Sequence, residues 1–315
     1  MVILVLNCGS SSIKYQVIDM EQTGSTRLAK GLVERIGLSD GVLTHKPVGR
    51  ENFELHRAIP DHTTGIRLVL DALTDPAHGV VGSLDEIKAV GHRVAHGGEF
   101  FPESCIVTEE VKSKIRSLFE IAPLHNPANL EGVLSIEKVL PGTPQVTVFD
   151  TSFHQTIPAM NYLYALPHAY YEKYRVRKYG FHGTSHHYVA RKGAELAGLD
   201  YEKSKIVTCH IGNGASVTAV LDGKSYDTSM GFSPLDGLVM GTRCGAIDAS
   251  AITFIGAKEG MSYAELDEMM NKRSGVQGMT DLSSDMRDID KAYNEGNPRA
   301  IVARDMYYNR VKKFV

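Results

Sequence analysis

The sequence predicts an α/β protein built from two similar domains, and three observations support this. The chain opens with an apolar strand, a polar turn and a second strand over residues 2–19. The same pattern returns over residues 205–222, where Gly212 aligns with Gly9. Segments with helical periodicity lie between these two hairpins and after them. The two hairpins lie much farther apart in the sequence than the repeats of a solenoid do. We therefore expect two facing domains, at residues 1–150 and 151–315.

Composition limits the possible functions. The 315 residues are 43% apolar and 23% charged, as in soluble globular proteins. The 34 basic and 37 acidic residues give no electrostatic reason to expect nucleic acid or an anionic membrane as a partner. No stretch has the length of a membrane-spanning helix, and residues 2–6 lack the basic flank of a signal peptide. Four scattered cysteines favour a reducing cytoplasm over a disulfide scaffold.

The first half alternates strands with loops rich in glycine or proline. Residues 13–19 alternate apolar and polar side chains, which is typical of a half-buried strand. Residues 88–98 read as a short strand that enters a glycine-rich loop. Residues 122–140 begin as a loop and become an amphipathic helix, which Asn126 or Asn129 would cap.

The second half begins after a strand within residues 145–154 that stops at Asp150. A helix is predicted over residues 186–200, ending near Gly198. The last sixteen residues, AIVARDMYYNRVKKFV, form another predicted helix. Its apolar repeat continues to the end of the chain without a capping residue, so we expect exposed apolar surface, poor solubility and little activity from these 315 residues alone.

The two polar turns are predicted to hold phosphate. Gly, Ser and Asn let backbone N–H groups converge on one anion, glycine tolerates positive φ, and Lys14 adds a positive charge just inside the second strand. An ordinary hairpin with a polar turn is the alternative for either turn alone, but two related turns favour phosphate binding. Neither turn is a Walker loop, and residues 212–214 lack the dinucleotide-binding spacing.

Four further segments concentrate reactive side chains. Asp150 follows a strand, where α/β proteins present ligands. Arg93 and Arg243 lie near glycines and suit bidentate binding of a carboxylate or phosphate, although either could be a solvated loop arginine. His182 and His186 have the spacing of two metal ligands on one helical face, but the intervening residues favour a helix cap. We therefore favour structural roles for His186 and His187 over a zinc site.

Taken together, these motifs resemble the acetate kinase family, within the superfamily of acetate and sugar kinases, heat-shock chaperones and actin. The matching motifs occur in the family's order over nearly the whole chain: LNCGSSSIKY, GHRVAHGG, PLHNP, FDTSFHQTIP, YGFHGTSHHYV, CHIGNGASV, GTRCGAID and SSDMRDI. The resemblance implies an α/β fold of two duplicated actin-like (ribonuclease H-like) domains, with an active-site cleft between them and a second domain that is incomplete at its C-terminus.

The resemblance also implies a reaction and its partners. Acetate kinases transfer the γ-phosphoryl group of ATP to acetate, reversibly and in line, giving acetyl phosphate and ADP. They use Mg²⁺, for which Mn²⁺ is a possible substitute, and they act as homodimers. Acetate is already ionised at pH 7, so the reaction needs positive charge more than a strong base.

The implied site residues fall into four groups. Asn7 and Asp150 help to place Mg²⁺, and Asp150 orients the metal rather than removing a proton. Arg93 and Arg243 hold the carboxylate and the transferring phosphoryl group, which His182 stabilises. The acyl group and its surroundings match Ala95, Leu124, His125, Phe181 and Pro234. The nucleotide-contacting positions are Ser10, Ser12, Lys14, His210, Ile211, Gly212, Asn213, Gly214, Asp285, Met286 and Arg287.

The chain departs from the family's pattern at a few positions. Ala246 stands where the family usually has Asp, which is expected to loosen the orientation of Arg243, and Ala249 replaces a frequent Pro. Ala95 replaces a frequent Val, so the acyl pocket is expected to be slightly larger and to accept propionate. The family also continues well beyond Val315, with an adenosine-binding loop, a metal-associated glutamate and a helix that returns to the first domain.

Alternatives to an acetate kinase remain at this point. A propionate or butyrate kinase of the same family is one, although Leu124, Phe181 and Pro234 favour the shortest acids. A non-catalytic ATP-binding member of the superfamily is another, but nucleotide gating alone needs no carboxylate-binding arginines. A catalytically inactive homologue is the third.

Overall fold

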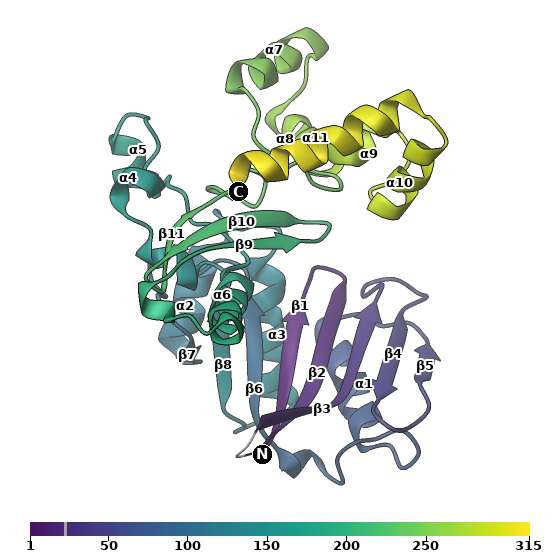
Figure 1. Ribbon diagram of the computed structural model, residues 1–315. Helices are drawn as coiled ribbons and strands as arrows, with labels where there is room; N and C mark the ends of the chain where they lie inside the picture. Colours follow the sequence, from purple (N-terminus) through teal and green to yellow (C-terminus); the bar gives the residue numbers. More distant parts are fainter. Residues whose placement is uncertain (22–23) are drawn as a thin grey trace. The chain divides into compact units, whose positions relative to one another are not determined.

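A computed structural model of the chain describes residues 1–21 and 24–315 (Figure 1). It divides the chain into two compact units, residues 1–152 and 153–315. No helix within the described residues has the length and apolar character needed to cross a membrane.

The first unit is a mixed sheet with helices. Its strands lie in the order β5-β4-β3-β2-β1-β6-β8-β7. Strands β1 to β5 pair antiparallel in sequence order, whereas β1, β6 and β8 run parallel to one another. The bounds are β1 Val2–Cys8, β2 Ser12–Glu21, β3 Gly24–Glu34, β4 Val42–Pro47, β5 Phe53–His56, β6 Ile87–Val94, β7 Cys105–Ile106 and β8 Gln145–Phe149, with helices α1 His62–Thr74, α2 Glu109–Ser117 and α3 Asn126–Val139 and a 3-10 turn at Leu84–Glu86.

Helices α1 and α3 cover one face of this sheet (Figure 1). The predicted alternation in β2 is confirmed, because Ile13, Tyr15 and Val17 are buried while Lys14 and Gln16 are exposed. The buried residues form a core with apolar side chains from α1 and α3. A second cluster, centred on stacked Phe101 and Phe149 rings, supports the end of β8.

The second unit combines a smaller antiparallel sheet with several helices. Its strands lie in the order β11-β10-β9. Their bounds are β9 Lys205–Ile211, β10 Ala215–Leu221 and β11 Lys224–Thr228. The helices are α4 Ala159–Tyr162, α5 Ala169–Tyr174, α6 Gly183–Ala197, α7 Ala249–Glu259, α8 Tyr263–Lys272, α9 Gly275–Thr280, α10 Met286–Asn294 and α11 Pro298–Phe314, with 3-10 turns at Ser152–Thr156 and Tyr201–Lys203.

Most of the predicted elements are confirmed, including both hairpins and the strand before Asp150. Helix α6 ends at Gly198, which adopts the left-handed conformation of a C-cap. The predicted cap of α3 is wrong. His125 occupies the N-cap position but its side chain makes no capping hydrogen bond. The Asn126 and Asn129 side chains are buried and bonded to other parts of the first unit, so they do not cap the helix.

Candidate active site

In the first unit, three predicted residues converge at one edge of the sheet. Asn7 lies near the end of β1, Arg93 near the end of β6, and Asp150 directly after β8. These three strands are parallel neighbours, so their carboxyl ends meet at the same edge. The Asp150 backbone N–H donates to the Val94 carbonyl at 3.0 Å and fixes the Asp150 backbone beside β6.

Arg93 binds both of its predicted neighbours. Its Nε donates to Asp150 Oδ1 at 2.9 Å and its Nη2 to Oδ2 at 2.6 Å, which is a bidentate ion pair. Its Nη1 donates to Asn7 Oδ1 at 3.1 Å. Burial alone would lower the pKa of Arg93, but the Asp150 carboxylate outweighs this effect and raises the pKa. Arg93 is therefore a fixed cation at this edge.

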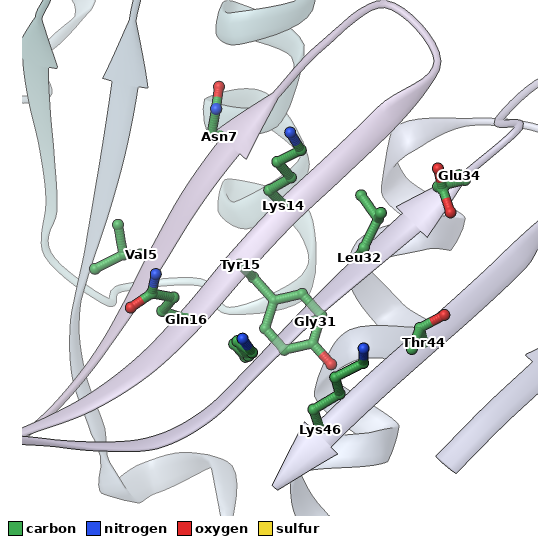
Figure 2. Close-up of a pocket in the computed structure, with 11 residues that line it drawn as sticks. Val5, Asn7, Lys14, Tyr15, Gln16, Gly31, Leu32, Glu34, Thr44 and Lys46 are labelled. Atoms are coloured by element: carbon green, nitrogen blue, oxygen red, sulfur yellow. The ribbon is translucent and has the colours of Figure 1, made fainter. Parts of the chain in front are cut away.

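Lys14 lies beside this cluster. It is the cross-strand partner of Asn7 in the β1–β2 pair, and Figure 2 shows the two side chains next to each other. Both line a pocket of about 560 Å³ that continues over the exposed side chains of β2, β3 and β4. Lys14 is thus placed to add positive charge near Asn7.

The turn between β1 and β2 is built differently from our prediction. Gly9 does not have positive φ. A Cβ atom on residue 9 would lie 3.2 Å from Ser12 Oγ, so a larger residue here would require the Ser12 side chain to shift. The Gly9 N–H donates to the Ser12 carbonyl at 2.8 Å, and His62 Nε2 donates to the Gly9 carbonyl at 2.7 Å. Ser10 is exposed at this turn.

The acyl-group residues of the first unit gather around the start of α3. Ala95 is buried, and its N–H donates to Asn129 Oδ1 at 2.9 Å. Leu124 is exposed, and His125 is half-buried at the helix N-cap. These residues therefore lie around the start of α3 and the loop that follows β6, the strand that carries Arg93.

Asn126 and Asn129 are important residues whose role the sequence did not reveal. Asn129 Nδ2 donates to the Cys8 carbonyl at 2.6 Å, and Asn126 bonds both backbone groups of His96. The two asparagines thereby join α3 to the ends of β1 and β6. In the sequence, their position on the mainly apolar face of the helix was the feature that could have indicated a buried role.

In the second unit, His182 and Arg243 lie at the turn between β9 and β10. His182 precedes α6 in the left-handed conformation, with φ of 58°. A Cβ atom placed on Gly214 would be 3.3 Å from Arg243 Nη1 and 3.7 Å from His182 Nε2. Both side chains therefore approach the same point of the turn, and a side chain on residue 214 would crowd them. Gly212 and Gly214, like Gly9, do not have positive φ.

Arg243 has quite different partners from Arg93. Its Nη1 donates to the Pro234 carbonyl at 3.3 Å and lies 3.9 Å from Met240 Sδ. Within the described residues, no carboxylate pairs with its guanidinium. Burial lowers its pKa. A half-buried cation without a negative partner is suited to binding an anion.

The contacts of Ala246 and of the nearby carboxylate Asp248 show what surrounds the position where the family usually has Asp. The Ala246 carbonyl accepts from Arg310 Nη1 at 3.2 Å. The remaining carboxylate, Asp248, caps α7 by accepting from the Ser250 N–H at 2.8 Å. Asp248 is therefore engaged in the helix cap instead of pairing with Arg243.

Phe181, which precedes His182 in the chain, and His210, whose ring contacts that of His182, lie in different environments. Phe181 is buried in an apolar cluster with Met230 and Met240, so its ring is part of the core of this unit. The His210 ring stacks on that of His182 with centroids 3.9 Å apart, and its Nδ1 lies 2.9 Å from Ser185 Oγ.

The predicted nucleotide segments of the second unit line one pocket of about 430 Å³. Its lining residues are Ile211, Gly212, Asn213, Gly241, Ser284, Asp285, Met286 and Tyr307. Asp285 caps α10, and its ion pair with exposed Arg287 lowers its pKa to about 2. Gly241, Ser284 and Tyr307 were not predicted as site residues. Gly241 and Ser284 lie within the motifs GTRCGAID and SSDMRDI, whereas Tyr307 lies outside the motifs.

His186, one of the two histidines with metal-ligand spacing, and its neighbour His187 make other contacts. His186 is buried, and both of its ring nitrogens bond to hydroxyl groups, whereas His187 is exposed and stacks on Phe153. No group of three His, Cys, Asp or Glu side chains suited to a metal occurs within the described residues. The oxygen atoms of Asn7 and Asp150 instead match the ligands that Mg²⁺ prefers when substrate phosphates complete its coordination.

Comparison with known proteins gives a consistent result. The model of the acetokinase family matches residues 2–315. The acetate kinase of Desulfitobacterium hafniense is 54% identical over 315 residues, which are 100% of this chain and 78% of that protein. The crystal structure of Porphyromonas gingivalis acetate kinase has a TM-score of 0.95 and 48% identity, covering 99% of this chain and 78% of that one. The crystal structure of a propionate kinase from Francisella tularensis has a TM-score of 0.92 and 40% identity, covering 99% of this chain and 78% of that one.

Proposed function

This chain belongs to the acetokinase family, and we propose that it transfers the γ-phosphoryl group of ATP to acetate, giving acetyl phosphate and ADP. It is accordingly a phosphotransferase with a carboxyl group as acceptor, on a two-domain actin-like α/β fold. The observation that carries the proposal is the family match over residues 2–315, in a chain whose two units each place an arginine among predicted site residues.

The chemistry requires charge and position more than proton transfer. A carboxylate oxygen of acetate forms a bond to the γ-phosphorus while the bond from that phosphorus to the ADP oxygen breaks. Carboxylic acids titrate near pH 4, so acetate is already a nucleophilic anion at pH 7. Two anions must approach each other, and catalysis depends on stabilising the charge of the transferring group.

We assign the first unit to the acceptor and the metal. Arg93 holds the acetate carboxylate, for which its guanidinium gives up part of its bidentate contact with Asp150. Asp150 and Asn7 supply oxygen ligands for Mg²⁺, which when bound offsets charge on the β- and γ-phosphates. Lys14, Ser10 and Ser12 are assigned to the nucleotide phosphates. Mn²⁺ is a possible substitute, because it also prefers oxygen ligands.

We assign the second unit to the phosphoryl group and the nucleotide. His182 and Arg243 approach one point of the β9–β10 turn, where they stabilise the transferring group. The pocket lined by residues 211–213 and 284–286 takes the nucleotide. His210, Gly214 and Arg287 border these two sites.

Acetate is the proposed acceptor, with propionate as the second candidate. Ala95, Leu124 and His125 would lie near the acyl group in the first unit, and Pro234 and Phe181 in the second. Ala95 is buried, so the absence of two methyl groups relative to valine enlarges this pocket. One methylene in an apolar pocket changes selectivity by about 1–3 kcal/mol, which would allow propionate to react.

Further features of the proposal follow the family. The enzyme acts as a homodimer in the cytoplasm, with domains at residues 1–150 and 151–315, and it has no nucleic-acid or membrane partner. The described cysteines are free, as a reducing compartment would keep them. Light scattering of the purified protein measures its molar mass in solution and hence the number of subunits.

Trapping of the acyl phosphate with hydroxylamine tests the reaction. Purified protein is incubated with MgATP and acetate, propionate or butyrate, with a reaction lacking acid as the control. We expect the strongest hydroxamate signal with acetate. A stronger signal with propionate would keep the reaction and change the substrate. ATP hydrolysis without any hydroxamate would contradict the proposal.

The role of Asp150 has a separate test. If Asp150 orients the metal, an Asp150→Asn variant loses activity and requires more Mg²⁺, while the shape of its pH–rate profile stays the same. Loss of an ionisation from that profile would instead show that Asp150 removes a proton.

A further inference from the structure

We propose that Ser216 and His186 are positioning residues, which hold His182 through a buried chain of hydrogen bonds and direct its outer ring nitrogen at the transferring phosphoryl group. The proposal rests on the proposed function, because it depends on the assignment of His182 to that group. It concerns two residues that the reaction itself does not require to touch the substrate.

The chain of hydrogen bonds is continuous and enclosed. Ser216 Oγ lies 2.8 Å from His182 Nδ1 and 2.7 Å from His186 Nε2. His186 Nδ1 lies 2.7 Å from Thr208 Oγ1, and Thr208 Oγ1 lies 3.5 Å from the Thr218 carbonyl. Ser216 is 0% exposed and His186 is 1% exposed, so water cannot replace these contacts.

The single hydroxyl proton of Ser216 couples the two imidazoles. Ser216 contacts a nitrogen of each ring but can donate to only one of them, so it must accept a hydrogen bond from the other. Burial lowers the pKa of His186 to about 3, so this imidazole is neutral and carries one N–H. The direction of donation is therefore the same along the whole chain.

The Thr218 carbonyl selects one of the two directions, because a carbonyl only accepts. With Thr208 donating to it, His186 Nδ1 donates to Thr208 and Ser216 donates to His186 Nε2. Ser216 Oγ must then accept from His182 Nδ1. This arrangement accommodates the imidazolium form of His182, whose Nε2–H can donate to a phosphoryl oxygen.

The ring of His182 is also held by its other neighbours. His210 stacks on it with an interplanar angle of 18°. The titratable and charged neighbours of this ring include His186 from α6, His210 from β9 and Arg243 beside Gly214, and the ring of His154 lies near that of His186. These groups are neutral or positive near pH 7, so the acceptor at Ser216 offsets repulsion that the imidazolium would otherwise meet.

The test compares two buried serines, each bonded to a histidine. Ser216→Ala removes the acceptor for His182. Ser225→Ala is the matched control, because Ser225 is 0% exposed and its Oγ lies 2.8 Å from His154 Nδ1. In the hydroxamate assay we expect kcat to fall roughly ten- to a hundredfold in Ser216→Ala, as for loss of a bond to a charged group, and to change less than about threefold in Ser225→Ala.

The pH dependence separates positioning from general damage. Activity that needs the imidazolium falls as pH rises through the pKa of His182. Ser216→Ala disfavours that form, so the alkaline limb of its kcat profile moves to lower pH by roughly one pH unit. An unmoved limb, or an equal loss of kcat in Ser225→Ala, would overturn the proposal.

Histidine side-chain ¹⁵N NMR of the full chain tests the same chain of bonds without an activity measurement. We expect a lower titration midpoint for His182 in Ser216→Ala, and a smaller shift in the same direction in Thr208→Val, which also serves if Ser216→Ala does not fold. Unchanged midpoints would reject the positioning role even in an active enzyme. A wild-type protein that makes no acyl phosphate would reject the proposed function, while the NMR result still decides the hydrogen-bonded chain.

Discussion

The hairpins β1–β2 and β9–β10 are built on one pattern but differ in register and burial. In the first, Cys8 pairs with Ile13, whereas in the second Ile211 pairs with Ala215, so the second turn is one residue shorter. Strand β2 alternates buried and exposed side chains, but β10 is buried on both faces over Ala215–Thr218. The first hairpin therefore presents Lys14 beside Asn7, and the second encloses Ser216.

This difference explains why the two arginines have different surroundings. Beside the first hairpin, the ends of β6 and β8 bring Arg93 and Asp150 together as an ion pair. At the second, a hairpin buried on both faces leaves Arg243 with a carbonyl and a thioether as partners. Two hairpins of one pattern thus lie beside arginines with different partners, depending on what surrounds each hairpin.

The largest expected effect separates the two arginines. Arg93→Ala and Arg243→Ala should each lower kcat/KM by about 10²–10³-fold, because each removes a charge that stabilises the phosphoryl group or its acceptor. Only Arg93→Ala should also lower the free energy of unfolding, by about 1–3 kcal/mol, since it leaves buried Asp150 without its partner. Urea unfolding checks this, with Arg35→Ala in an exposed pair as the control. Equal stability losses for Arg93→Ala and Arg243→Ala would contradict the comparison.

Acidification should destabilise both units through buried histidines. Burial lowers the pKa of His92 and of His154 to about 4 and that of His186 to about 3, from an ordinary value of 6.5. Below pH 6.5 the unfolded chain takes up protons that the folded chain does not, so this stability is complete above pH 6.5 and is lost as pH falls toward 4. When the pH falls from 7 to 5, each of these histidines should lower the free energy of unfolding by about 2 kcal/mol.

Urea unfolding at these two pH values measures the acid effect. Exposed His56 provides the control, and His56→Gln should leave the acid sensitivity unchanged. If His92→Gln, which removes one buried imidazole, loses as much stability on acidification as the wild type, burial of neutral histidine is not the cause.

The packed face of the first sheet should tolerate less change than its open face. A Cβ atom on Gly31 would lie 2.3 Å from Tyr15 Cζ, in a ring whose hydroxyl bonds buried His45 at 2.6 Å. Gly31→Ala should therefore lower the free energy of unfolding by about 1–3 kcal/mol. Gly91→Ala in β6 is the matched control, since nothing lies within 4 Å of its added Cβ. A similar loss at both positions would argue against close packing at Tyr15.

The smallest expected effect concerns acceptor length. Ala95→Val should reduce the kcat/KM for propionate relative to acetate by roughly tenfold, because it fills part of the acyl pocket. The hydroxamate assay with both acids gives this ratio. A ratio that stays equal or rises would show that residue 95 does not limit the acyl chain.

Local patterns predicted the parts of the fold that depend on neighbouring residues. The alternation in residues 13–19 and the glycine at 198 encode a half-buried strand and a helix end, and both occur where expected. The strand before Asp150 was predicted for the same reason. The resemblance to a family, carried by ordered motifs, contributed the site residues.

Tertiary hydrogen bonds were beyond local patterns. Asn126 and Asn129 fit a helix cap in sequence, but Asn129 bonds the distant Cys8 carbonyl, and no spacing rule indicates that partner. Gly9 lacks the positive φ predicted for the turn, and its close approach to the Ser12 side chain depends on how the hairpin is paired. Similarly, the contact of Ser216 with both imidazoles depends on how α6 packs against the β9–β10 hairpin.

Both arginine sites are proposed to act in one direct transfer of the phosphoryl group. The most direct test uses ATP with a γ-phosphoryl group made chiral by oxygen isotopes and determines the configuration at phosphorus in the acetyl phosphate. A single in-line transfer from ATP to acetate predicts inversion. Retention would show two successive transfers through a phosphorylated intermediate, and would contradict the account.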